Sequence, residues 1–409
     1  MDNSDIYVAI PAMDERQELP LTLQNLAEQQ DAGRFYIYVC VNQPESFWQI
    51  SDKTVICQHN AQLLDYLRQL PLPNLHIIDK SSKGNGWDDK HSGVGWARKT
   101  LFDTILSVAA SEDIIVSLDA DTRISPHYLA SVRHTFARRP DIPALAVPYF
   151  HPLASNEPTD RAILRYEFYM RNYAINLLRI GSPYGFTALG SAIAMRANAL
   201  RKIGGITPLK SGEDFYLMQK FRKMAPIGLY NKESVFPATR PSDRVDFGTG
   251  PAIIKGVKGN WSAYPIYHYS LFQSIEETYH HISELFDHHI DTSFLHFLQN
   301  NNTNTTVAKN QTDIWQSIRQ NVKDLPHFEQ AFHEKADGLR ILQFLRQKQK
   351  ENPMRDEEAL YDNMTLWIPD LLPEWYSRST AFEKYSVEQL DILRCMLFDL
   401  EMDLRKKTG

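Results

Sequence analysis

The chain has 409 residues, of which 43% are hydrophobic and 23% are charged, and its formal net charge is −6. This length suggests one large domain with an extension, or two domains. The composition is ordinary for a water-soluble globular protein, and the negative charge gives no electrostatic reason to expect a nucleic-acid partner.

The three cysteines, Cys40, Cys57 and Cys395, are far apart in the sequence, which argues against a disulfide framework and a cysteine metal site. The N-terminus lacks the basic and apolar regions of a signal peptide. No stretch approaches the ~20 apolar residues of a membrane-spanning helix. We therefore expect a cytoplasmic protein without a transmembrane segment. Peripheral membrane contact and the oligomeric state are left open.

The first half of the chain alternates between two hydrophobic patterns. Apolar runs predict strands at residues 6–10, 36–41, 75–78 and 114–118. Helical periodicity predicts helices at residues 19–30, 61–70 and 94–108. This β-α-β-α order predicts an α/β fold, a mostly parallel sheet flanked by helices.

After about residue 270 the alternation stops and helical patterns follow, interrupted by the polar stretch Asn300–Thr306, an expected surface loop. We therefore predict a main domain over residues 1–269 and an α-helical extension over residues 270–409. Within the main domain we expect two halves, over about residues 1–125 and about residues 126–269.

Two carboxylates, Asp119 and Asp121, follow the apolar run Ile114–Leu118. Ligands of open α/β sheets bind beyond the carboxyl ends of the strands. Two acids at such an edge suit a hard divalent cation that bridges to phosphate oxygens. Aspartate also starts turns and caps helices, so the pair alone equally fits a turn.

Asp119 and Asp121 belong to a series of short motifs that follow one another along the chain. They are Pro11–Glu15, Gly93–Arg98, Asp119–Asp121, Gly190–Ala192, Gly204–Gly205 and Gly212–Phe215. Each is weak evidence alone, but their order and spacing resemble family 2 glycosyltransferases, over roughly residues 5–250. The resemblance implies a GT-A fold, a nucleotide-diphosphate sugar as donor, and a carbohydrate or other hydroxyl compound as acceptor. It also implies that about residues 1–125 form the nucleotide-sugar half of the main domain and about residues 126–269 the acceptor half.

The resemblance also implies donor-binding residues. Pro11 and Glu15 lie in the segment that matches the family's nucleotide-contacting loop, P-x-x-N-E, in which Asp14 here replaces the Asn. Asn42 lies near the position where the family carries an Asp that reads the base. Arg98 lies at the start of the helix that faces the diphosphate in the family.

The same resemblance implies the reacting groups. Asp119 would bind ribose or metal and Asp121 the metal, which is Mn²⁺ or Mg²⁺. Glu213 and Asp214 match the family's E-D pair, with Asp214 as the base that deprotonates the acceptor hydroxyl. His268 is a candidate third metal ligand, because several GT-A enzymes use a histidine after the E-D region.

The loop Arg240–Gly250 carries Arg240, Arg244 and a Gly-x-Gly. Such a loop could close over the diphosphate or hold a charged acceptor, and a structural salt bridge is the alternative. The Q-x-x-R-W motif of the processive synthases has its nearest likeness at Gln316–Gln320, without the Trp. We therefore expect a non-processive enzyme.

These features together predict a metal-dependent, inverting glycosyltransferase that adds one sugar. A sugar-phosphate nucleotidyltransferase, a retaining GT-A enzyme and a non-catalytic binding protein stay open as alternatives. Glu213 and Asp214 would also favour a helix N-terminus electrostatically. The histidine pairs His280-His281 and His288-His289 fit a solvated helix face better than a zinc site.

Overall fold

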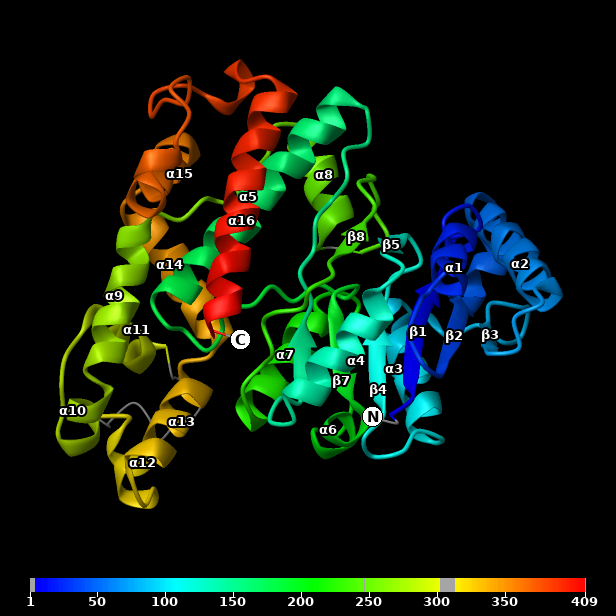
Figure 1. The fold of residues 1–409 in the computed structure, drawn as a ribbon, viewed down its shortest axis with the longest axis horizontal. Coiled ribbons are helices and arrows are strands. Elements are labelled where there is room, and N and C mark those ends of the chain that lie inside the picture. Colours follow the sequence, from blue (N-terminus) through cyan, green and yellow to red (C-terminus); the bar gives the residue numbers. More distant parts are fainter. Residues whose placement is uncertain (1–3, 246, 302–312, 409) are drawn as a thin grey trace. The chain divides into compact units, whose positions relative to one another are not determined.

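The computed structural model describes residues 4–245, 247–301 and 313–408 (Figure 1). Its contacts divide the chain into two compact units, each described here by itself. The α/β unit comprises Met1–Ile163, Thr187–Gly259 and Arg405–Gly409, and the helical unit comprises Leu164–Phe186 and Asn260–Leu404. The predicted domain boundary at residue 269 stays a prediction.

The α/β unit is built on a six-stranded sheet with the order β3-β2-β1-β4-β7-β6. The strands are β1 (Ile6–Ala12), β2 (Phe35–Asn42), β3 (Leu75–Lys80), β4 (Ile114–Ser117), β6 (Ala144–Ala146) and β7 (Ile193–Arg196). Strands β1 to β4 pair in parallel, whereas β7 runs antiparallel to both β4 and β6. A small antiparallel sheet joins β5 (Thr122–Ile124) and β8 (Val235–Pro237).

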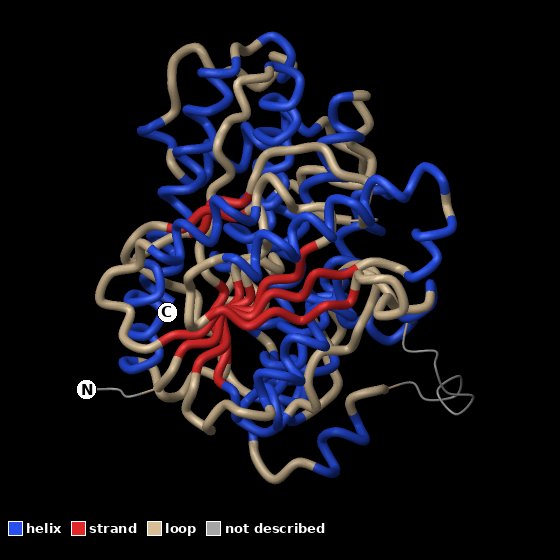
Figure 2. The backbone as a smooth tube through the Cα atoms, turned by 90° about the vertical axis from the view of Figure 1, so that its right-hand side faces the viewer, coloured by secondary structure: helices blue, strands red, loops and turns tan. Residues whose placement is uncertain are grey.

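Helices cover both faces of the main sheet, as Figure 2 shows. Those of the α/β unit are α1 (Leu19–Ala27), α2 (Thr54–Gln69), α3 (Val94–Leu106), α4 (Tyr128–Arg138), α6 (Ala197–Lys202), α7 (Glu213–Met224) and α8 (Thr249–Val257). Helix α2 packs against β2 and β3, and α3 packs against β1 and β2. The predicted fold class, a mostly parallel sheet flanked by helices with further helices in the C-terminal part, is confirmed.

Strand β4 fixes the position of the acid residues that follow it. Ile114, Ile115 and Val116 are fully buried, and the strand pairs with β1 on one side and β7 on the other. Two β-branched isoleucines and a valine suit such a strand, which is buried on both faces. The chain therefore leaves the sheet beside the end of β1, with Asp119 just past the strand.

The helical unit contains α9 (Tyr269–His280), α10 (Ile282–Asp287), α11 (Ser293–Asn300), α12 (Gln316–Asn321), α13 (Leu325–Lys335), α14 (Gly338–Glu351) and α15 (Asp356–Trp367). Helices α5 (Glu157–Arg179) and α16 (Val387–Thr408) contribute residues to both units. Most of the predicted loop Asn300–Thr306 lies outside the described residues, and Asn300 itself ends α11.

A buried ion pair network joins α5 and α16 within the helical unit. The Arg171 guanidinium donates to the carboxylates of Glu167 and Glu401, at 2.7 and 2.8 Å. All three side chains are almost fully buried, so loss of one partner would leave an uncompensated buried charge. Among the described residues, no helix has the length and apolar character needed to cross a membrane.

Candidate active site

Acidic side chains gather where the parallel strands of the α/β unit end. Glu15 follows β1, Asp119 and Asp121 follow β4, and Glu213 and Asp214 open α7. Three regions that are far apart in the sequence thus contribute carboxylates to one network of contacts. Carboxylates that lie close together repel one another, so their arrangement requires compensating cations.

Arg98 is the first of these cations. Its side chain projects from α3 and is almost completely buried. Its Nη2 donates to Asp119 Oδ1 at 2.5 Å, and its Nη1 donates to Glu213. Although burial opposes the charge, the two carboxylates raise the pKa of Arg98. One guanidinium therefore joins α3, the end of β4 and the start of α7.

Two glycines make room for this arrangement. A Cβ atom at Gly190 would collide with the Arg98 guanidinium, and one at Gly95 would collide with the Leu209 carbonyl. The Gly190 loop is held to β4 because Ser117 Oγ donates to the Gly190 carbonyl at 2.7 Å. At both positions the close approach explains why the chain carries glycine.

Arg240 and Arg244 supply the other cations, from the loop that follows β8. Arg240 Nε donates to Asp121 Oδ2 at 2.7 Å, and Arg240 Nη2 donates to Glu15. Arg244 Nη1 donates to Glu15 Oε1 and to the Met13 carbonyl, both at 2.5 Å. The structure thus brings both predicted arginines onto the predicted acids.

Glu15 is buried between these arginines. Burial raises its pKa, although Arg244 and Arg240 act in the opposite direction. Both arginines bind the Oε1 atom, while the buried Oε2 atom has no hydrogen-bond partner among the described residues. A buried oxygen without a partner is costly, which makes Oε2 a candidate contact for a bound ligand.

The arginines offset the negative charge of Asp214 only in part. Burial and the neighbouring Glu213 raise the pKa of Asp214 to about 7, against the opposing effects of Arg98 and the Phe215 amide. Burial also raises the pKa of Asp119, and Arg98 opposes that shift. A carboxyl group that titrates near neutral pH is suited to take a proton in a reaction.

Other predicted residues serve visible structural contacts. Pro11 lies within β1, and Asn42 ends β2 with its Nδ2 donating to the Ala12 carbonyl at 3.0 Å. His268 lies in the helical unit, where it caps α9 and its Nε2 is 3.7 Å from Asp362. Burial lowers the pKa of His268. The donor role of Asn42 and the metal role of His268 stay predictions.

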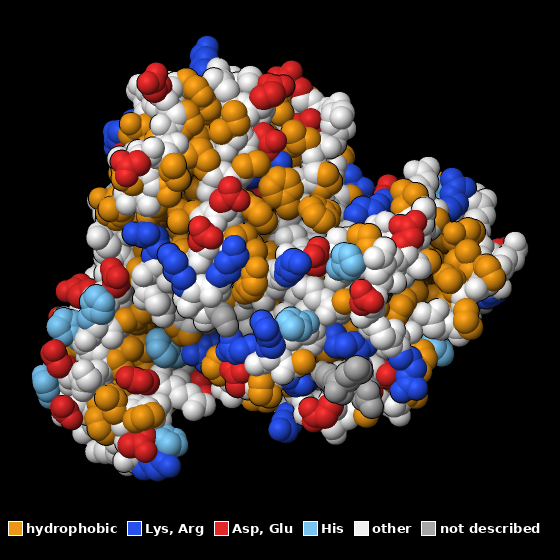
Figure 3. Space-filling view, in the orientation of Figure 1, with side chains coloured by type: hydrophobic (Ala, Val, Ile, Leu, Met, Phe, Trp, Pro, Cys, Tyr) orange, Lys and Arg blue, Asp and Glu red, His pale blue; other side chains and the backbone are white. Residues whose placement is uncertain are grey.

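The described residues contain no group of three or more His, Cys, Asp or Glu side chains arranged to hold a metal ion. Histidines gather over the part of the helical unit that holds α9 to α13 (Figure 3). His281 pairs with Glu284 at 3.0 Å, and His289 lies 3.8 Å from Asp313. These contacts fit the solvated surface expected for the histidine pairs.

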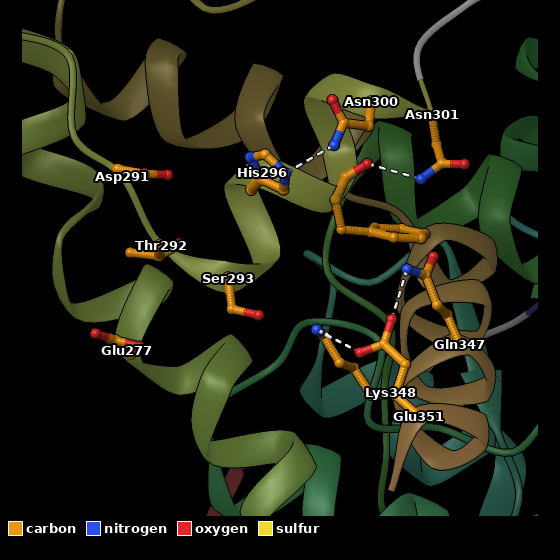
Figure 4. A pocket seen from close by; sticks show the side chains of 11 residues that line it. Glu277, Asp291, Thr292, Ser293, His296, Asn300, Asn301, Gln347, Lys348 and Glu351 are labelled. Atoms are coloured by element: carbon orange, nitrogen blue, oxygen red, sulfur yellow. Dashed lines mark hydrogen bonds and ion pairs between the residues drawn. The ribbon is translucent and has the colours of Figure 1, made fainter.

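A polar pocket of about 580 Å³ lies in the helical unit (Figure 4). It is lined by Glu277, Asp291, Thr292, Ser293, His296, Phe297, Asn300, Asn301, Gln347, Lys348 and Glu351. Many of its polar groups bond one another, as Lys348 does with Glu351 at 2.8 Å and Asn300 with His296 at 2.9 Å. None of the site residues predicted from the sequence lines this pocket.

His59 is a contact residue of the Pro11–Glu15 segment that the sequence does not predict. This residue lies on α2, and its Nδ1 is 2.6 Å from Asp14 Oδ1. The two residues are 45 positions apart, so no local motif could reveal the contact.

Residues 114–262 match the family model described as glycosyl transferase family group 2. This match confirms the resemblance. The predicted enzyme class, a glycosyltransferase, is confirmed as well. The matched stretch of the glycosyltransferase begins at β4 and includes Asp121, Asp214 and both arginines of the loop after β8.

The glycosyltransferase is also similar to crystal structures of S. aureus TarS 1-349. The complex with UDP-GlcNAc has a TM-score of 0.43 at 13% sequence identity, and the complex with UDP has a TM-score of 0.41 at 13% identity. Each alignment covers 99% of this chain and 91% of that chain. These scores add nothing to the topology described above. No curated protein is significantly similar in sequence.

The contact of Arg98 with Gly190 gives a direct test of the site. We expect Gly190→Ala to displace the Arg98 guanidinium, because the new methyl group occupies its place. Misplaced groups in an active site cost about 100-fold, so sugar transfer should fall by at least about tenfold. Steady-state kinetics measure the loss, and a thermal unfolding scan checks that the variant is folded. A folded variant with normal transfer would contradict a functional role for the contacts of Arg98 with Asp119 and Glu213.

Proposed function

We propose that the α/β unit transfers one sugar from a nucleotide-diphosphate sugar to an acceptor hydroxyl, with inversion and without processive addition. The observation that carries this proposal is Asp214, a carboxyl group with a pKa of about 7 beside the bridge formed by Glu213, Arg98 and Asp119. The match of residues 114–262 to a glycosyltransferase family supports the same reaction class.

Asp214 acts as the general base. It takes the proton of the acceptor hydroxyl while the hydroxyl oxygen bonds to the anomeric carbon and the bond from that carbon to the diphosphate oxygen breaks. The nucleoside diphosphate leaves with the electron pair. A single base suffices for such a direct displacement, which inverts the anomeric centre.

The arginines bind negatively charged groups, which are the phosphates of the donor and the carboxylates of the site. Arg240 and Arg244, which bind Asp121 and Glu15 in the present structure, can bind phosphate oxygens through paired N–H donors. Arg98 is enclosed between Asp119 and Glu213, so it acts as a positioning residue for these two acids rather than as a free phosphate ligand.

A divalent cation, Mn²⁺ or Mg²⁺, fits the donor set of Asp119 and Asp121. Their hard oxygen atoms are the ligands that such ions prefer, and one or two carboxylates with substrate phosphates and water commonly complete a site. The ion would act as a Lewis acid that stabilises charge on the leaving diphosphate. With Glu15, Glu213 and Asp214, these acids outnumber the three arginines by two charges when all are ionised.

The role of Asp214 predicts a large effect on turnover. We expect Asp214→Asn to lower kcat by about 10²- to 10⁴-fold, because the amide cannot take the proton. The rate of the natural enzyme should rise with pH through about 7, as the Asp214 carboxyl loses its proton. Release of nucleoside diphosphate measures the rate. Asp103→Asn is the matched control, because Asp103 is exposed on α3 and pairs with Lys99.

Near-normal turnover by Asp214→Asn would contradict the base assignment. Release of pyrophosphate in place of nucleoside diphosphate would identify a sugar-phosphate nucleotidyltransferase. The anomeric configuration of the product, measured by NMR, separates inversion from retention.

The proposed role of the cation leads to a second prediction. We expect EDTA to abolish transfer and added Mn²⁺ or Mg²⁺ to restore it, because the leaving diphosphate loses its counter-charge without the ion. Asp121→Asn should raise the cation concentration needed for half-maximal activity, since one carboxylate ligand is lost. Undiminished transfer in EDTA would remove the cation from the mechanism.

A further inference from the structure

Asp14 has a backbone conformation that few residues other than glycine adopt. Its φ angle is +59°, in the left-handed region. Aspartate tolerates this region better than most residues, yet such conformations cost free energy and cluster at functional sites. The contacts that hold Asp14 in this conformation therefore merit a functional explanation.

Two consecutive residues of α2 hold Asp14. The Asp14 amide donates to Asn60 Oδ1 at 2.9 Å, and His59 Nδ1 lies 2.6 Å from Asp14 Oδ1. One neighbour thus binds the backbone and the other binds the side chain. Both the conformation and the direction of the carboxylate are fixed by the same helix.

Helix α2 is itself anchored at this point. Asn60 is fully buried, and its Nδ2 donates to Gln43 Oε1 at 2.8 Å and to the Asn42 carbonyl at 3.2 Å. Gln43 Nε2 in turn donates to Cys57 Sγ at 2.9 Å. The amide network joins α2 to the end of β2, which places His59 at the carboxyl edge of the sheet.

The partner of His59 is the neighbour in sequence of a residue of the candidate active site. Asp14 precedes Glu15, whose carboxylate binds Arg240 and Arg244. The side chains of His59 and Asp14 are 29% and 37% exposed, so a ligand can reach the pair. Unlike Asn60, this pair is not part of the buried core.

The pair has a defined hydrogen-bonding character. An ionised carboxylate only accepts hydrogen bonds, so the Nδ1–H of His59 donates to Asp14. In a neutral imidazole this leaves Nε2 as an acceptor. The sheet edge thus offers an acceptor on the partner of Asp14, which directly precedes Glu15, whereas the Asn42 Nδ2 group is occupied by the Ala12 and Cys40 carbonyls.

We propose that His59 recognises the nucleoside of the donor, with Nε2 accepting a hydrogen bond from a ribose hydroxyl or a base N–H group. Asp14 is its positioning residue. This inference rests on the proposed function, because it requires a nucleotide donor. His59 would thereby join the donor-binding residues, although it lies on α2 and outside every motif described in the sequence.

The test is a binding titration by calorimetry, with Mn²⁺ present and with UDP, CDP, GDP, ADP, dTDP and inorganic pyrophosphate as probes. We expect His59→Ala to weaken the best-bound nucleotide by about three- to tenfold, as for loss of one hydrogen bond, and to leave pyrophosphate binding unchanged. Gln62→Ala is the matched control, because Gln62 is exposed on α2 and bonds Arg16 next to Glu15. It should bind every probe normally.

Further variants test the positioning role. Asp14→Asn keeps a side chain that tolerates the left-handed backbone and an oxygen that can accept from His59, so it should bind within about twofold of the natural enzyme. Asp14→Ala should weaken nucleotide binding about as much as His59→Ala, and the double variant should weaken it no further. Additive losses would contradict the positioning role.

The outcomes separate the two proposals. If the natural enzyme binds none of the nucleotides, the proposed function fails. If it binds one and His59→Ala changes neither its affinity nor that of the others, or weakens pyrophosphate equally, the inference fails. A 2′-deoxy or 3′-deoxy analogue that removes the effect of His59→Ala identifies the ribose as the partner, and an unchanged effect identifies the base.

Discussion

The shared guanidinium of Arg98 is the interaction on which the site of this protein depends. It bonds Asp119 beyond β4 and Glu213 at the start of α7, and it is nearly inaccessible to solvent. Removal of one partner from such a buried group leaves an uncompensated charge, which commonly costs about 3–5 kcal/mol. The Gly190 backbone lies so close to this guanidinium that a Cβ atom at position 190 would collide with it. Packing and chemistry therefore constrain the same few residues.

The arginines do not compensate every acid equally. Glu15 binds two of them, yet burial still raises its pKa. Asp214 has a pKa of about 7 because partial desolvation and the neighbouring Glu213 both disfavour its charge. A fold selected for stability alone would avoid this excess of closely spaced carboxylates. The excess is understandable where a cation and a proton must be bound. The excess of carboxylates thus both lowers the stability of the fold and supplies the groups that the proposed reaction needs.

Much of the fold was predictable, because strands β1 to β4 and helix α3 have hydrophobic patterns of different period that the sequence displays directly. The acids at the strand ends were predictable for the same reason. Arg98 was expected to face a diphosphate, whereas its enclosure between two carboxylates depends on a contact that spans 115 positions. The contact of His59 with Asp14, and the antiparallel direction of β7, likewise depend on tertiary pairing. Such pairings leave no local pattern in a single sequence.

The most direct test of the charge excess is the pH dependence of thermal stability for the natural enzyme and Asp214→Asn. The pKa of Asp214 is about 7 in the folded protein, against an ordinary value of 3.8. The ionised carboxylate therefore lowers stability progressively as the pH rises from about 4 through 7, and this effect is absent from the amide. We expect Asp214→Asn to gain melting temperature relative to the natural enzyme at pH 8, by more than at pH 4. An equal difference at both pH values, or a loss at pH 8, would contradict the account.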